Sequence, residues 1–214
     1  MCRARLAGVA LCALLAALPM WANPVWADPV RVTARWDGDA VIVEAQARLR
    51  APLHLIWEVL TGYDRYAEFV PDLQSSRVLS RDGHTALIEQ RGTAGFFLYR
   101  FPLEVKLTVT EVPFERVTCQ AVAGNFKELS GVYELFPETD AARDPGGSPE
   151  GNPEGNPEGN KVVRFGYRGR LVPAFRLPPL IGLPALRASV ERQFGALVRE
   201  VERRSAGLPA PDAK

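Results

Sequence analysis

The feature that most constrains the fold is the alternation of apolar and polar side chains between Tyr99 and Val112. Apolar residues occupy every second position from Phe101 to Val109, and mainly charged or hydroxyl side chains fill the positions between them. Successive side chains of a strand point to opposite faces of its sheet. The pattern therefore predicts a strand with one buried and one solvated face, which needs neighbouring strands and an apolar element packed against the buried side.

Six other segments have the composition of strands. The Asp82-Gly83 pair is a typical hairpin turn, and short connections of this kind join antiparallel neighbours. Together with residues 99–112, these segments predict a curved antiparallel sheet of about seven strands. They cover residues 41–49, 73–80, 84–93, 116–123, 128–137 and 161–172.

Helical spacing appears in two places. Two short helices are predicted after the first strand, one over residues 53–60 that ends at Gly62 and one over Tyr63–Phe69 before Pro71. A long amphipathic helix is predicted over residues 184–204, and the buried face of the sheet is the surface that can cover its apolar stripe. This stripe consists of Leu186, Val190, Phe194, Leu197 and Val201.

The first 27 residues have the layout of a secretory signal peptide. Arg3 and Arg5 precede an apolar run of mainly Leu, Ala and Val over residues 6–18, and Ala27 ends a segment of the cleavage-site type. The run is shorter than the roughly 20 residues that cross a bilayer. We therefore expect a periplasmic or secreted protein that is cleaved after Ala27, with Ala22 as the alternative cleavage site.

The remaining chain has the composition of one globular domain. Removing Arg3 and Arg5 from the 26 basic residues leaves 24 against 25 acidic ones, so no basic surplus indicates a nucleic-acid partner. Cys119 is the one cysteine beyond the leader and cannot form an internal disulfide. The expected domain spans residues 28–205, followed by a flexible tail at 206–214.

A Pro-Glu-Gly-Asn repeat over residues 148–160 interrupts the strand pattern. It has nothing to bury, so residues 140–160 are predicted to be a disordered loop insertion. Its recurring glutamates, Glu150, Glu154 and Glu158, lack the fixed geometry of a calcium cage.

With this order of elements, several stretches resemble the helix-grip, START-like family of polyketide cyclases and coenzyme Q-binding proteins. The resemblance covers residues 41–204. It rests on Trp57–Leu73 (WEVLTGYDRYAEFVPDL), Ser76–Leu79 (SRVL), Val122–Leu135 (VAGNFKELSGVYEL) and Leu171–Pro173 (LVP). It implies an α+β fold in which the sheet grips the terminal helix, with a hydrophobic cavity between them.

Strand parity and this resemblance together predict the residues that line the cavity. The predicted ligand-binding set is Phe101, Leu103, Val105, Tyr133, Phe165, Tyr167, Phe175, Leu186, Val190 and Phe194. The segment from Pro173 to Pro184 is the predicted gate for ligand exchange. No cofactor or metal ion is expected.

The same parity predicts an inner surface with little catalytic chemistry. Only Cys119, Tyr133 and Tyr167, with Gln90 as a fourth candidate, place polar atoms inward, and no inward acid is expected. A general acid or base must reach the reacting atom. His54 and His84 are expected at the surface, and Glu200 with Arg204 on the solvated face of the long helix.

The leading hypothesis is an exported, non-catalytic carrier or chaperone of a lipid-, isoprenoid- or quinone-type molecule. Transient contact with a membrane is compatible with this hypothesis. One alternative is an enzyme of the cyclase/dehydrase type that acts on a polyketide-like or aromatic substrate, and it requires an inward acid, histidine or arginine. A second alternative is a protein-interaction module.

Overall fold

The computed structural model describes residues 29–96, 99–138, 162–174 and 182–207, with the side chains of residues 94–101 and 173 excluded. The expected signal peptide, the loop insertion and most of the tail lie outside these residues. So do Phe175, the side chain of Phe101 and most of the predicted gate.

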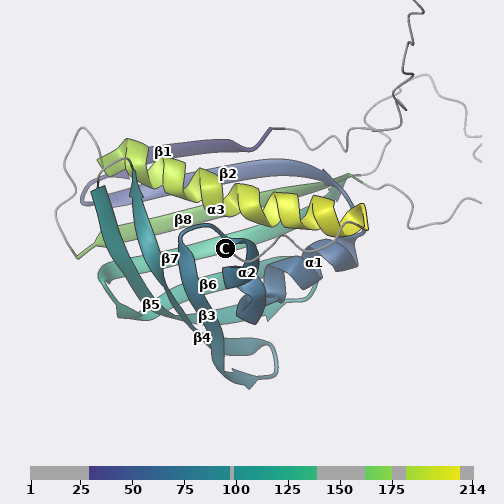
Figure 1. The fold of residues 1–214 in the computed structure, drawn as a ribbon, viewed down its shortest axis with the longest axis horizontal. Coiled ribbons are helices and arrows are strands. Elements are labelled where there is room, and N and C mark those ends of the chain that lie inside the picture. Colours follow the sequence, from purple (N-terminus) through teal and green to yellow (C-terminus); the bar gives the residue numbers. More distant parts are fainter. Residues whose placement is uncertain (1–28, 97–98, 139–161, 175–181, 208–214) are drawn as a thin grey trace, which may run out of the picture.

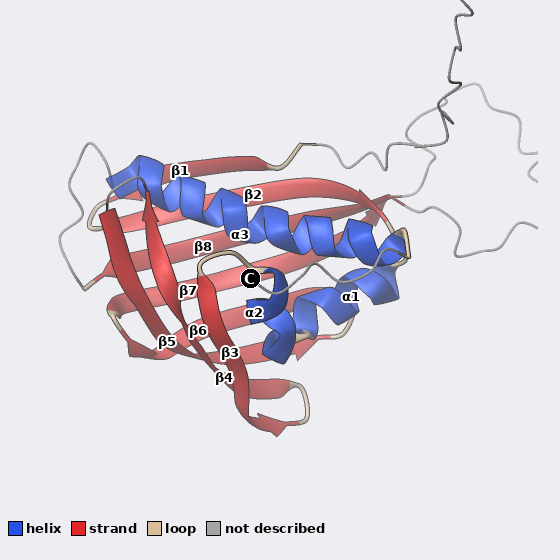
Figure 2. Ribbon diagram, viewed as in Figure 1, coloured by secondary structure: helices blue, strands red, loops and turns tan. Residues whose placement is uncertain are grey.

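The described chain forms one antiparallel sheet with helices on its concave face (Figures 1 and 2). The strand order is β1-β2-β8-β7-β6-β5-β4-β3, so the first and third strands form the two edges. The sheet has eight strands, one more than predicted. Their bounds are β1 Arg31–Asp37, β2 Ala40–Arg50, β3 Leu73–Asp82, β4 Thr85–Phe96, β5 Tyr99–Val112, β6 Arg116–Gly124, β7 Phe126–Glu138 and β8 Val162–Pro173.

The additional strand is β1. It pairs with β2 through a tight turn in which Gly38 has a φ of 61°, a conformation that glycine adopts without steric cost. The two turn residues, Gly38 and Asp39, are a hairpin signal in the sequence. The sequence prediction began the sheet at Val41 and therefore missed the strand before it.

The helices agree closely with the predicted segments. Helix α1 spans Leu53–Thr61, and the second predicted helix is a 3-10 turn η1 at Tyr63–Arg65 that continues as α2 at Tyr66–Phe69. The long helix α3 covers Gly182–Ser205 and contacts β1, β2, β4 and α1. None of the helices in the described ranges combines the length and the apolar character needed to cross a membrane.

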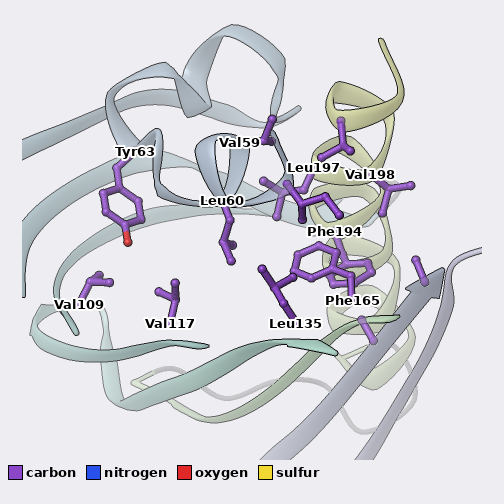
Figure 3. Packing of buried hydrophobic residues seen from close by; sticks show 14 of the residues in the cluster. Val59, Leu60, Tyr63, Val109, Val117, Leu135, Phe165, Phe194, Leu197 and Val198 are labelled. Atoms are coloured by element: carbon purple, nitrogen blue, oxygen red, sulfur yellow. The ribbon is translucent and has the colours of Figure 1, made fainter. Parts of the chain in front are cut away.

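The core lies between α3, α1 and the inward face of the sheet (Figure 3). Leu60 of α1, Phe194 and Leu197 of α3 and Phe165 of β8 are at most 4% exposed. On β5, Val105, Leu107 and Val109 are buried while Glu104 and Lys106 are exposed. The predicted alternation is therefore confirmed, and burial of this apolar face stabilises the helix grip.

The prediction for Glu200 was wrong. Its side chain is only 3% exposed, and it accepts hydrogen bonds from Arg203 and Arg204 at 2.7–2.8 Å. Arg204 also bonds to Glu58 of α1 at 2.9 Å. Helical spacing indicated the intrahelical pair, but packing of α1 beside the end of α3 decides that the pair is buried.

Candidate functional site

Eight of the ten predicted cavity residues have described side chains, and the structure divides them into two groups. Val105, Phe165 and Phe194 are at most 4% exposed and belong to the core. The remaining five are partly buried: Leu103, Tyr133, Tyr167, Leu186 and Val190. Only this second group keeps surface that a ligand can touch.

Aromatic rings connect α3 to the middle of the sheet. Phe194 stacks on Phe165 with a centroid separation of 4.5 Å, and Phe165 stacks on Tyr133 at 5.9 Å. Tyr133 then contacts Tyr167, its register partner on β8, at 4.6 Å. Two buried phenylalanines thus hold one end of the row, and two partly buried tyrosines form the other.

Cys119 lies on β6 beside the tyrosine pair. It is partly buried, its thiol donates a hydrogen bond to the carbonyl of Gly131 at 3.4 Å, and burial raises its pKa to about 11. A thiol with so high a pKa stays protonated near neutral pH and is a poor nucleophile. Cys119 therefore packs against the core on the inward face, as its strand parity predicted.

Gln90 is a second polar group on the inward face. Its amide nitrogen donates to the hydroxyl of Ser76 at 3.3 Å, and Ser76 is buried at 4% exposure. This pair joins β3 to β4 near the edge of the sheet. The sequence had named Gln90 as a candidate inward residue, and the structure adds its partner.

The expectation that no acid faces inward was wrong. Glu111 lies on β5 in the same alternation as Val109 and is 8% exposed. It accepts a hydrogen bond from the Tyr63 hydroxyl at 2.9 Å and two from Arg81 at 3.1 Å. Parity alone indicated this acid, but the sequence analysis followed the apolar run only as far as Val109.

The Tyr63–Glu111–Arg81 cluster has the geometry of a structural anchor. Tyr63 is 3% exposed, and Arg81 lies over its ring at 5.8 Å from the centroid. The three residues come from η1, β5 and β3. Both carboxylate oxygens of Glu111 accept hydrogen bonds from this cluster. These bonds hold the 3-10 turn against the sheet.

The charged side chains of the central strands lie on the outward face, as predicted. Glu89 pairs with Arg77, Arg91 and Lys106 at 3.0–3.7 Å. Arg170 of β8 joins Asp37 of β1 at 2.8 Å and Glu128 of β7 at 3.1 Å. This face is solvated and crossed by ion pairs, and it carries a hollow of about 220 Å³ lined partly by Glu89, Arg91 and Lys106.

Both histidines lie at the surface, as predicted. His54 and His84 are both exposed, and no three His, Cys, Asp or Glu side chains in the described ranges come together as metal ligands would. Asn125 forms a tight connection between the end of β6 at Gly124 and the start of β7 at Phe126. Asn125 in this turn bonds to Pro102 and Glu104 of β5.

An ion pair joins α3 to the turn before β3. Arg192 of α3 bonds to the Asp72 carboxylate at 3.0–3.1 Å, and Asp72 lies in the turn between α2 and β3. A separate hollow of about 340 Å³ lies between β1 and the start of α3, and it is lined partly by Arg187 and Glu191. The tyrosine pair contributes nothing to that hollow.

A family model described as polyketide cyclase / dehydrase and lipid transport matches residues 49–198. None of the curated proteins compared with the chain matches it.

Three solved structures illustrate the similarity in fold. The Zhui aromatase/cyclase from Streptomyces sp. R1128 is 17% identical, with a TM-score of 0.55 over 79% of this chain and 99% of that one. A STAR-related lipid transfer protein from Xanthomonas axonopodis is 13% identical, with a TM-score of 0.58 over 82% and 94%. A START superfamily protein from Mycobacterium smegmatis is 12% identical, with a TM-score of 0.53 over 78% and 99%.

Proposed function

Because the chain belongs to the polyketide cyclase / dehydrase and lipid transport family, we propose that it binds a hydrophobic small molecule on the inward face of its sheet and carries it without chemical conversion. The observation that carries the proposal is the contrast among the inward polar groups. The described inward acid Glu111 is occupied by Tyr63 and Arg81, whereas the tyrosine pair is partly buried and open to contact.

Apolar contact would supply most of the binding free energy. Each buried methylene contributes roughly 0.8 kcal/mol, and the partly buried Leu186 and Val190 of α3 face the same core as the tyrosines. A ligand of the lipid, isoprenoid or quinone type therefore needs no charged anchor.

A native extract tests this function. The protein is purified from its own host and extracted with organic solvent, and the bound molecules are identified by mass spectrometry. We expect a stoichiometric hydrophobic molecule that is lost in a Tyr133→Trp, Tyr167→Trp variant, because the added rings fill the ligand space. Val122→Trp is the matched control, since Val122 is 58% exposed. An empty wild-type protein, or equal loading of all variants, would contradict the proposal.

Catalysis is the second candidate, and Glu111 is the observation that favours it. The enzyme hypothesis required an inward acid, and Glu111 supplies one beside a tyrosine hydroxyl. Incubation of the bound molecule with fresh protein separates the two functions. A change in its mass that Glu111→Gln abolishes would establish an enzyme, and recovery of the unchanged molecule would support a carrier.

The same proposal includes export to the periplasm or medium. It rests on the charged, apolar and small-residue pattern of the first 27 residues. Sequencing the N-terminus of the protein from separated cell fractions tests it. We expect a periplasmic or secreted chain that begins at Asp28, and an intact leader in the cytoplasmic fraction would contradict export.

A further inference from the structure

Two glycines make room for Tyr167 on the surface of the sheet. Gly131 of β7 and Gly169 of β8 are direct register partners. A Cβ atom at Gly131 would lie 2.8 Å from Cε2 of Tyr167, and one at Gly169 would lie 2.3 Å from its hydroxyl oxygen. The tyrosine ring therefore occupies the volume that two side chains would fill, and it lies along the sheet instead of standing away from it.

The neighbouring rings hold Tyr133 beside it. Tyr133 contacts Tyr167 on one side and stacks on the buried Phe165 on the other. Phe165 is fixed in turn by Phe194 of α3. The two hydroxyls thus belong to adjacent rings with a rigid apolar backing, which is the arrangement that orients a bound polar group.

Neither hydroxyl has a hydrogen-bond partner within the described part of the chain. In the same residues, every side-chain oxygen or nitrogen that is sealed from solvent does have a partner. The two hydroxyl oxygens must therefore remain reachable by a molecule the size of water. Buried tyrosine hydroxyls normally find a partner inside the protein, so this pair is available to a ligand.

The electrostatic surroundings indicate which ligand group fits. Burial raises the pKa of both tyrosines above the ordinary value, so both are neutral hydrogen-bond donors at physiological pH. Among the described residues, the titratable groups that act on the pair are Cys119 and the tyrosines themselves. A buried ligand carboxylate would find no compensating cation among these groups, and that desolvation is costly.

We propose that Tyr133 and Tyr167 select a hydrophobic ligand with a neutral carbonyl group, whose oxygen accepts hydrogen bonds from their hydroxyls. This inference rests on the proposed function, since it names the ligand class of the same site. A carbonyl oxygen has two lone pairs and can accept from both donors. A hydrocarbon of the same shape leaves both hydroxyls unpaired, and a carboxylate carries a charge that the site does not balance.

Three probes of the same ring skeleton test the inference on the full-length protein. Anthraquinone, anthracene and anthracene carboxylic acid present a neutral carbonyl, no polar group and an anion. Their dissociation constants are measured by fluorescence titration. We expect wild-type protein to bind anthraquinone about ten times more tightly than anthracene, the ratio expected from one or two neutral hydrogen bonds. The carboxylic acid should bind more weakly than anthraquinone at neutral pH.

The double variant Tyr133→Phe, Tyr167→Phe should remove this preference. We expect its anthraquinone affinity to fall about tenfold, while its anthracene affinity changes less than about twofold. Tyr66→Phe is the matched control, because the Tyr66 hydroxyl already donates to the carbonyl of Leu60. It should keep the wild-type ratio between the two probes.

A glycine pair tests the space above the ring separately. Gly169→Ala should push Tyr167 away from the sheet and weaken all three probes, because the new methyl would collide with its hydroxyl. Gly166→Ala is its control, since the nearest atom to a Cβ there is the Glu134 carbonyl oxygen at 3.9 Å. Equal binding in both glycine variants would overturn the placement of the ligand over Tyr167.

The outcomes separate the two proposals. Equal affinity for anthraquinone and anthracene, or a preference that survives the double variant, would overturn the carbonyl inference while leaving a hydrophobic carrier intact. Tightest binding of the carboxylic acid would overturn the requirement for a neutral group. Failure of all three probes to bind, together with an empty native extract, would instead overturn the proposed function.

Discussion

Two tyrosine-containing regions lie on the inward side of the same sheet, and they differ in whether their polar groups are satisfied. At Tyr63 the hydroxyl is bonded to Glu111, whose carboxylate also binds Arg81. At Tyr133 and Tyr167 the hydroxyls have no partner among the described residues. In the first region the polar atoms hold the fold together. In the second, we propose that the hydroxyls bind a ligand.

The presence or absence of an internal hydrogen-bond partner indicates the role of a polar group inside an apolar fold. A buried donor or acceptor without a partner costs more free energy than a paired one returns. Such a group persists where water or a ligand reaches it. Satisfaction of hydrogen bonds therefore distinguishes Tyr63 from Tyr133 and Tyr167, although all three lie on the inward side of the sheet.

Removal of the Glu111 carboxylate should give the largest effect. We expect Glu111→Ala to lower the free energy of unfolding by about 2–3 kcal/mol, because it leaves Tyr63 unpaired in a buried position and frees Arg81. Urea denaturation followed by circular dichroism measures the change. Glu115→Ala, at an exposed turn position, should change stability by less than about 0.5 kcal/mol. A loss at Glu111 no larger than this control would break the structural half of the comparison.

Single hydroxyl deletions come next and compare the regions directly. We expect Tyr63→Phe to cost about 1–2 kcal/mol, because the buried carboxylate loses a donor. Tyr133→Phe and Tyr167→Phe should each stay within about 0.5 kcal/mol of wild type, since neither removes an internal hydrogen bond. The same denaturation series measures all three. Equal losses at the three sites would remove the distinction between them.

Alkaline pH should lower the free energy of unfolding by a smaller amount, and part of this loss should come from Tyr133 and Tyr167. Burial raises the pKa of Tyr133 and Tyr167 in the folded protein. Their contribution to stability is therefore complete below the ordinary tyrosine pKa of about 10 and declines as the pH rises above it. We expect the double phenylalanine variant to lose less stability between about pH 10 and 11 than wild type. Thermal unfolding across that range measures it, and parallel curves would contradict the expectation.

The smallest effect is expected at Glu200, a third buried polar group with its partners in place. Burial raises its pKa, but the hydrogen bonds from Arg203 and Arg204 outweigh burial and hold the pKa below its ordinary value. Its contribution is complete above the ordinary carboxyl pKa of about 4.3 and is lost as the pH falls through the lowered value.

Glu200→Gln should therefore reduce the loss of stability in acid, although only slightly, because the amide keeps some hydrogen bonds and Arg204 keeps Glu58. Acid titration of wild type and variant, followed by circular dichroism, measures the difference. A variant more sensitive to acid than wild type would show that the sign is wrong.

The order of elements followed from the sequence in most places because it depends on local periodicity. Alternation on β5 predicted which of its residues are buried, and spacing in α3 predicted the stripe that contains Phe194 and Leu197. The missing strand β1 had a readable signal in the Gly38-Asp39 turn. Glu111 was also missed, although it continues the inward parity of β5 beyond Val109.

Local sequence patterns predicted less of the candidate site. Parity placed Tyr133 and Tyr167 on the inward face, but nothing local indicated that Gly131 and Gly169 clear the space in which the Tyr167 ring lies. That arrangement depends on the register between β7 and β8, which brings the two glycines opposite each other. It therefore became visible only with the strands paired.

Local patterns in the chain were enough to predict the periodicity of most elements, the inward or outward face of most side chains and the resemblance to a helix-grip family. The tertiary structure alone decided which inward polar groups find partners. Tyr63 and Glu111 are separated by 48 positions, and Arg81 and Glu111 by 30. Periodicity acts over a few residues, whereas hydrogen bonding inside a fold depends on distances that only the paired strands and packed helices bring within reach.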